Sequence, residues 1–143
     1  MKAERLISMY KLGFIGCGNM AKAMIGGIIG SGFIKADQII CADVNADMLN
    51  TAKENLGVNI TADNKKIAKE SELLVLSVKP QFYSQVISEI ADSVNDKTLI
   101  ITIAPGQSLD KVQEQFKKKV KLIRTMPNTP ALVLEGITAV CPN

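Results

Sequence analysis

Short apolar runs alternate with segments of helical spacing along most of this chain. The apolar runs, bounded by glycine or polar residues, predict buried strands at residues 12–15, 38–42, 73–78, 99–103 and 122–125. Apolar residues spaced three or four positions apart predict helices at residues 19–30, 46–55, 65–69, 81–91 and 109–118. Residues 57–60 predict a short edge strand, and the segment from Gly136 is a candidate last strand. The alternation predicts an α/β fold, a doubly wound and mostly parallel sheet flanked by helices.

Length and composition indicate a single domain of ordinary globular type. The chain has 143 residues, of which 47% are hydrophobic and 22% charged, enough to bury a core. No repeat or linker divides it, so we expect a short tail at residues 1–9 and one domain at residues 10–143. Its longest uncharged stretches are about a dozen residues, short of the ~18 to 20 that span a bilayer. The N-terminus lacks a basic start followed by an apolar block, which favours a cytoplasmic protein.

Composition also excludes several kinds of chemistry. The chain has no histidine, which removes the commonest metal ligand and His-based acid-base catalysis. Cys17, Cys41 and Cys141 have no C-x-x-C spacing, so we expect small core residues and neither a disulfide framework nor a metal site. A net charge of +3 with 4% aromatic residues disfavours nucleic-acid binding.

A glycine-rich turn lies between the first predicted strand and the first predicted helix. Gly16, Gly18 and Ala21 supply the pattern G-x-G-x-x-A, which in this position is typical of Rossmann dinucleotide-binding domains. The first glycine permits a tight turn, the second lets the backbone approach a pyrophosphate, and the alanine allows close packing. The helix that follows contains Gly26, Gly27 and Gly30, which predict a close approach of helix and sheet. The alternative is that the glycines serve packing alone.

An acidic residue ends the second predicted strand, where the adenosine ribose of a bound dinucleotide is expected. Asp43 can accept hydrogen bonds from both ribose hydroxyls and would repel a 2′-phosphate, so it favours NAD over NADP. The alternative is a helix cap, although Asn45 is better placed for that role.

Two further motifs follow later strands. "SVKP" at residues 77–80 places Lys79 at the carboxyl end of a strand, as a cation near a ligand or as a plain surface lysine. "RTMPNTPA" at residues 124–131 holds Asn128 and Thr129 between two prolines in a stiff, extended turn. Such a turn presents polar groups to a ligand or merely ends a strand.

With these three motifs, the chain from about residue 11 to 143 resembles the N-terminal half of the pyrroline-5-carboxylate reductases. The resemblance implies NAD(P)H-dependent reduction of the cyclic imine of 1-pyrroline-5-carboxylate to L-proline, in proline biosynthesis, by hydride transfer. It also implies a C-terminal helical half, outside this chain, that makes the homodimer or larger assembly and most substrate contacts. The isolated chain is therefore expected to be inactive.

Site residues carry over by position. Asp43 and the resemblance together give the expected cofactor-binding set: Ile15, Gly16, Cys17, Gly18, Asn19, Met20, Asp43, Asn64, Val78, Lys79, Pro80 and Ala104. Lys79, Asn128 and Thr129 are expected near the nicotinamide and substrate, and no catalytic residue or metal ligand is assigned in this half.

The chain departs from the family pattern at two positions. Asp43 replaces a small hydroxylated residue that suits NADP, so the cofactor is expected to be NADP or NAD with a bias toward NAD. Pro105 stands where the family commonly has alanine and removes a backbone donor. Two alternatives stay open: a related imine or 3-hydroxyacid dehydrogenase, and a non-catalytic NAD(P)-binding module.

Overall fold

The computed structural model describes residues 9–128 and 136–143. These residues form seven strands: β1 Tyr10–Ile15, β2 Ile39–Ala42, β3 Asn59–Thr61, β4 Ser71–Leu76, β5 Leu99–Thr102, β6 Lys121–Met126 and β7 Ala139–Pro142. They also form five α-helices: α1 Asn19–Gly30, α2 Ala46–Leu56, α3 Asn64–Glu70, α4 Tyr83–Ile90 and α5 Leu109–Phe116. Short 3₁₀ turns occur at Ala36–Gln38 and Pro80–Phe82.

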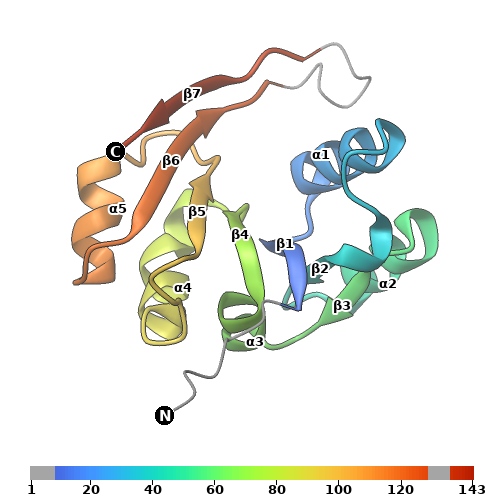
Figure 1. Cartoon of the computed structure of the whole chain (residues 1–143), viewed down its shortest axis with the longest axis horizontal. Coiled ribbons are helices and arrows are strands. Elements are labelled where there is room, and N and C mark those ends of the chain that lie inside the picture. Colours follow the sequence, from blue (N-terminus) through green and yellow to red (C-terminus); the bar gives the residue numbers. More distant parts are fainter. Residues whose placement is uncertain (1–8, 129–135) are drawn as a thin grey trace.

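The strands make one sheet in the order β3-β2-β1-β4-β5-β6-β7 (Figure 1). All neighbours are parallel except β6 and β7, which are antiparallel. The chain starts in the middle, since β1 pairs with both β2 and β4. The strand order therefore reverses beside β1, and the carboxyl edge at such a reversal is where ligands bind in open α/β sheets.

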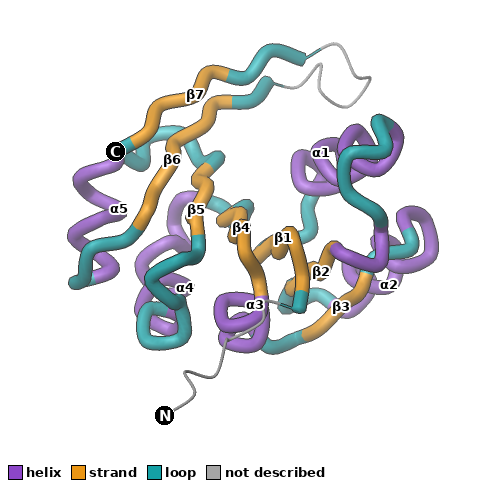
Figure 2. The backbone as a smooth tube through the Cα atoms, viewed as in Figure 1, coloured by secondary structure: helices purple, strands orange, loops and turns teal. Residues whose placement is uncertain are grey.

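Helices cover both faces of the sheet, as the tube in Figure 2 shows. One hydrophobic cluster joins the sheet to α1 and α2, and includes Ala21, Ile25 and Leu49. The other joins it to α3, α4 and α5, and includes Ile67, Ile87 and Phe116. The predicted doubly wound, mostly parallel sheet is confirmed, with residues 57–60 close to the edge strand β3.

Several predicted boundaries lie one or two residues from the observed ones, as at β4, α4 and α5. β4 ends at Leu76, two residues earlier than predicted, although the N–H of the next residue, Ser77, still donates to the carbonyl of Ile15 in β1 at 2.9 Å. The helix predicted at 81–91 begins at Tyr83, since a 3₁₀ turn starting at a proline precedes it. α5 ends at Phe116, before Lys117 takes a left-handed φ of 53°.

Two other expectations are also corrected. Cys17 and Cys41 are core residues as predicted, but Cys141 is exposed because it lies on the edge strand β7. Gly26 does not bring α1 onto the sheet: a Cβ there would first meet Leu56 of α2, at 3.9 Å. A Cβ on Gly30 would meet nothing within 4 Å.

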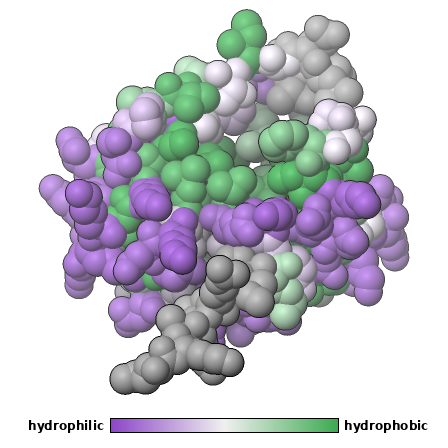
Figure 3. Space-filling model, viewed as in Figure 1, coloured by the Kyte–Doolittle hydropathy of each residue, from purple (hydrophilic) through white to green (hydrophobic). Residues whose placement is uncertain are grey.

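Most large hydrophobic side chains are buried, but some stay on the described surface. Figure 3 shows hydrophobic residues across the middle of one face, with hydrophilic residues gathered below and at its outer border. Val44 and Phe82 are among the exposed hydrophobic residues, and both border the pocket described below. No helix among the described residues is long and apolar enough to span a membrane.

A buried tyrosine joins β4 to the turn after β5. Tyr83 is fully buried, its hydroxyl donates to the carbonyl of Leu76 at 2.7 Å, and the nearby backbone of Ile103 and Ala104 partly offsets the effect of burial on its pKa. Burial raises the pKa of Tyr83 to about 12. The phenol is therefore neutral at physiological pH and acts as a structural brace.

The raised pKa of Tyr83 predicts a loss of stability in alkali. The stabilisation is complete below the unfolded-state pKa of about 10 and is lost as pH rises to about 12, a fall of about 2 to 3 kcal/mol. Denaturant unfolding of the wild type and Tyr83→Phe across this range measures it, since other titrating groups cancel in the difference. Tyr83→Phe should be about 1 to 3 kcal/mol less stable at neutral pH and decline less steeply. Parallel curves would contradict the prediction.

Candidate functional site

The turn after β1 has a backbone shape that only glycine can take. Gly16 has a φ of 101°, and its N–H donates to the carbonyl of Ala42 at 2.8 Å. A Cβ at this position would lie 2.7 Å from the carbonyl carbon and oxygen of Ser77. The Ser77 hydroxyl in turn donates to the carbonyl of Gly16 at 2.7 Å. The turn is therefore held tightly between β2 and β4.

The N-terminus of α1 has no side-chain cap. Gly18 is the N-cap residue, and the first backbone bond of the helix runs from Lys22 N to Gly18 O at 3.0 Å. The helices α2, α3 and α5, by contrast, are capped by Asn45, Asp63 and Ser108. The N–H groups at the start of α1 thus have no intrahelical acceptor and lie at the positive end of the helix dipole.

The surface over this helix start is open. A Cβ on Gly18 would meet nothing within 4 Å, in contrast to the crowded position of Gly16. Free N–H groups, a positive helix end and open space together fit an anion such as a pyrophosphate.

Asp43 holds the glycine turn in place. Its Oδ2 accepts from the N–H of Cys17 at 2.7 Å, and its Oδ1 accepts from the N–H of Asn45 at 2.9 Å. The carboxylate therefore bridges the turns after β1 and β2, a role that the sequence did not predict. Each oxygen keeps a further lone pair, so the expected acceptor role toward a ribose remains open. Asn45 is the cap of α2, as predicted, and accepts from the N–H groups of Asp47 and Met48.

The cysteines near this turn are structural. Cys17 and Cys41 are both fully buried, and a hydrogen bond between them lowers the pKa of the Cys17 thiol and raises that of the Cys41 thiol. Cys17 can therefore face a ligand only through its backbone. No cluster of three His, Cys, Asp or Glu side chains in the described part of the chain could hold a metal ion.

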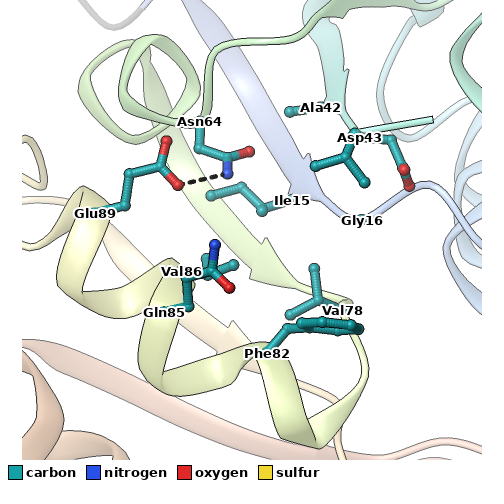
Figure 4. Close-up of a pocket in the computed structure, with 11 residues that line it drawn as sticks. Ile15, Gly16, Ala42, Asp43, Asn64, Val78, Phe82, Gln85, Val86 and Glu89 are labelled. Atoms are coloured by element: carbon teal, nitrogen blue, oxygen red, sulfur yellow. Dashed lines mark hydrogen bonds between the residues drawn. The ribbon is translucent and has the colours of Figure 1, made fainter. Parts of the chain in front are cut away.

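A pocket of about 190 Å³ opens beside Asp43 (Figure 4). It is bordered by the carboxyl ends of β1 and β2, the start of α3, the turn after β4, and α4. Its lining residues are Ile15, Gly16, Ala42, Asp43, Val44, Asn64, Val78, Phe82, Gln85, Val86 and Glu89. At one end the Asn64 side chain donates from Nδ2 to Glu89 Oε2 at 3.1 Å. Apolar walls with a few polar groups, here Asp43 at one end and Asn64 with Glu89 at the other, are typical of a small-molecule site.

The remaining predicted residues lie along the same carboxyl edge of the sheet. Val78, Lys79 and Pro80 follow β4, and Lys79 is exposed. Ala104 follows β5 but is 3% exposed, which limits it to backbone contacts. Asn128 follows β6, and its Oδ1 accepts from the N–H of Ile137 at 2.9 Å, so this side chain links the residues just after β6 to those just before β7. The predicted residue Thr129 lies outside the described residues.

Comparison with known proteins relates this geometry to a family. A family model described as "NADP oxidoreductase coenzyme F420-dependent" matches residues 11–106. The pyrroline-5-carboxylate reductase of Escherichia coli is 40% identical over 133 residues, which are 93% of this chain and 49% of the relative. The chain belongs to this oxidoreductase family and corresponds to the N-terminal NAD(P)-binding domain of pyrroline-5-carboxylate reductases.

Solved structures of the same family superpose well on this NAD(P)-binding domain. A pyrroline-5-carboxylate reductase from Coxiella burnetii matches with a TM-score of 0.89 and 33% identity, over 94% of this chain and 50% of that one. The Plasmodium falciparum pyrroline carboxylate reductase, solved with NADP bound, matches with a TM-score of 0.82 and 30% identity, over 96% and 49%. The domain spans about half the length of the curated relatives it matches.

Sequence reasoning missed several residues that shape the site, among them Ser77, Val44, Phe82, Gln85 and Glu89. Ser77 lies within the quoted "SVKP" motif, but its hydroxyl donates to the carbonyl of Gly16, a residue 61 positions away in the chain. Phe82, Gln85 and Glu89 were unassigned, although their spacing of three and four places them on one face of the predicted helix. The helical spacing was the signal in the sequence that could have grouped these residues. Only the strand order shows that their face of the helix borders the pocket.

Proposed function

We propose that this domain is the cofactor-binding half of an NAD(P)H-dependent 1-pyrroline-5-carboxylate reductase, which reduces a cyclic imine to L-proline. The observation that carries the proposal is the uncapped start of α1 behind the Gly16 turn. It occurs in a chain 40% identical to a pyrroline-5-carboxylate reductase. The geometry of the turn thus supports the binding of a dinucleotide, and the similarity to a pyrroline-5-carboxylate reductase supports the choice of substrate.

The residues present fit a dinucleotide pyrophosphate at the glycine turn. The N–H groups of Gly16 and Cys17 are used within the turn, by Ala42 and Asp43. Those of Gly18, Asn19 and Met20 are left to bind the phosphates. Backbone N–H groups at a helix start suit phosphate because they add a dipole to hydrogen bonds.

The adenosine end is proposed to lie in the pocket beside Asp43. The carboxylate would accept from the ribose hydroxyls, and the apolar side chains of Val44, Val78 and Phe82 would cover the base. Asn64 supplies a polar group at the far end. The opposite, nicotinamide end then extends along the carboxyl ends of β4, β5 and β6, toward Lys79 and Asn128.

Reduction of the imine requires few acid-base groups from this domain. A bound dihydronicotinamide supplies the hydride, and a protonated imine accepts hydride readily. The residues of this domain bind and orient, so that the reacting groups meet in a fixed geometry. Substrate-carboxylate contacts, the proton donor and a homodimer interface are proposed for the second half that the relatives have.

Cofactor binding and turnover test the proposal separately. We expect the chain to bind NADH and NADPH in calorimetry, with no oxidation of either when 1-pyrroline-5-carboxylate is added. A chimaera that joins residue 143 to the second half of the E. coli relative should oxidise both cofactors only with that imine present.

The outcomes against the proposal are distinct. Absence of NAD(P)H binding by the folded chain would overturn the cofactor role. Turnover by the chain alone would overturn the division of labour between the halves. A chimaera that binds cofactor but leaves the imine unreduced would contradict the proposed substrate.

A further inference from the structure

One amide at the pocket is oriented by a hydrogen bond to a neighbouring carboxylate, Asn64 being partly exposed and Glu89 exposed. Asn64 Nδ2 donates to Glu89 Oε2 at 3.1 Å, which joins the first turn of α3 to the last turn of α4. These two helices contact each other. Figure 4 shows the Asn64 carbonyl oxygen pointing away from Glu89, to the side where Ala42 and Asp43 lie. Both Asn64 and Glu89 line the pocket.

The chemistry of Glu89 decides which end of the amide faces it. An ionised carboxylate can only accept hydrogen bonds, whereas an amide has a donor end and an acceptor end. The NH₂ group of Asn64 must therefore face Glu89, and a hydrogen bond to a charged partner is about twice as strong as a neutral one. The carbonyl oxygen is left as a hydrogen-bond acceptor beside the pocket.

The other polar side chains of the pocket offer no comparable selection. Gln85 also borders the pocket, but no hydrogen bond fixes its amide among the residues that the structure describes, so it can turn either end to a ligand. Asp43 is a carboxylate that accepts two backbone N–H groups, and its remaining lone pairs are assigned to the ribose hydroxyls and not to the base. Asn64 is thus the pocket amide whose orientation is set by a neighbouring side chain.

We infer that Glu89 is a positioning residue that makes the pocket selective for adenine. It keeps the Asn64 carbonyl directed at the ring, where it accepts from the 6-amino group of adenine. Hypoxanthine has an oxygen at that position, so two acceptors would face each other and both would stay unpaired. The inference rests on the proposed function, because it takes the pocket to hold the purine of NAD(P)H.

Binding of NADH and of its analogue with hypoxanthine in place of adenine tests the inference. We expect the wild-type chain to bind NADH at least about tenfold more tightly than the analogue, the effect of one unpaired polar contact. Glu89→Gln should reduce this ratio by at least about threefold, mainly through tighter binding of the analogue, since a glutamine lets the Asn64 amide turn over. Asn64→Ala should bring the ratio close to one.

A matched control removes the same charge elsewhere. Glu114→Gln lies on the exposed face of α5, outside the pocket, and should keep the wild-type ratio. Thermal unfolding checks that each variant is folded. Equal binding of the two dinucleotides by the wild type, or a ratio that Glu89→Gln leaves unchanged, would overturn the inference while NADH binding upholds the proposed function. Binding of neither dinucleotide by the folded wild type would overturn both.

Discussion

Gly18→Ala is expected to weaken NADH binding by at least about tenfold while the fold stays intact. A Cβ at this position meets nothing in the protein within 4 Å, so it introduces no clash. It would occupy the open space over the free N–H groups of α1, where the pyrophosphate must approach closely. Calorimetric titration with NADH measures the loss, and denaturant unfolding should show a change of no more than about 1 kcal/mol, the cost of a poorer N-cap.

Gly16→Ala, two positions earlier, is expected to fail in a different way. Its Cβ would lie 2.7 Å from the Ser77 carbonyl group, at a φ of 101° that side chains rarely adopt. The expected loss of unfolding free energy is about 3 kcal/mol or more, since strain and overpacking add. Unfolding midpoints therefore separate the two glycines.

Gly30→Ala serves as the control for both variants. It lies at the other end of α1, where an added Cβ would also meet nothing within 4 Å. Binding and stability should stay close to wild type, with a gain of at most about 1 kcal/mol from better helix propensity. Wild-type NADH affinity in Gly18→Ala, or wild-type stability in Gly16→Ala, would contradict the assigned roles.

The elements could be predicted from sequence because each apolar run is buried in one place. β1, β4 and β5 lie in the interior of the sheet, and their near-continuous apolar runs reflect helices on both faces. Local motifs were predicted equally well, since Asn45 caps α2 and the tight turn lies at Gly16. The predictions for Gly26 and Gly30 were wrong because a glycine's neighbours depend on how the helix is rotated, which the pattern does not define.

Individual residues of the site were predicted from the sequence, but the hydrogen bonds between them were not. Asp43 and Asn64 were both assigned, yet neither the bond from Cys17 to Asp43 nor that from Asn64 to Glu89 was expected. These pairs are 26 and 25 residues apart. They meet only because β1 lies next to β2 and because α3 packs on α4. Such contacts follow from strand order and helix packing, which a single sequence does not encode locally.

Asp43→Asn is expected to shift cofactor preference from NADH toward NADPH by about tenfold or more. Two unit charges 4 Å apart repel by about 1 kcal/mol in water and about 4 kcal/mol near a protein surface, and a 2′-phosphate would carry its charge beside this carboxylate. The measurement is the ratio of dissociation constants for the two cofactors. Asp37→Asn is the control, because it removes the same charge from the opposite, amino end of β2 and should leave the ratio unchanged.

The two roles of Asp43 make separate contributions to that ratio. Asparagine keeps one acceptor oxygen, so the N–H of either Cys17 or Asn45 loses its hydrogen-bond partner. The free energy of unfolding should therefore fall by about 1 to 2 kcal/mol. A looser glycine turn weakens both cofactors equally, whereas the lost charge tightens NADPH alone. NADPH affinity should therefore rise in absolute terms in Asp43→Asn, and less so in Asp43→Ser, which loses both acceptors of the bridge. A wild-type preference for NADPH that neither substitution alters would refute the charge effect, while a fall in stability would leave the bridging role in place.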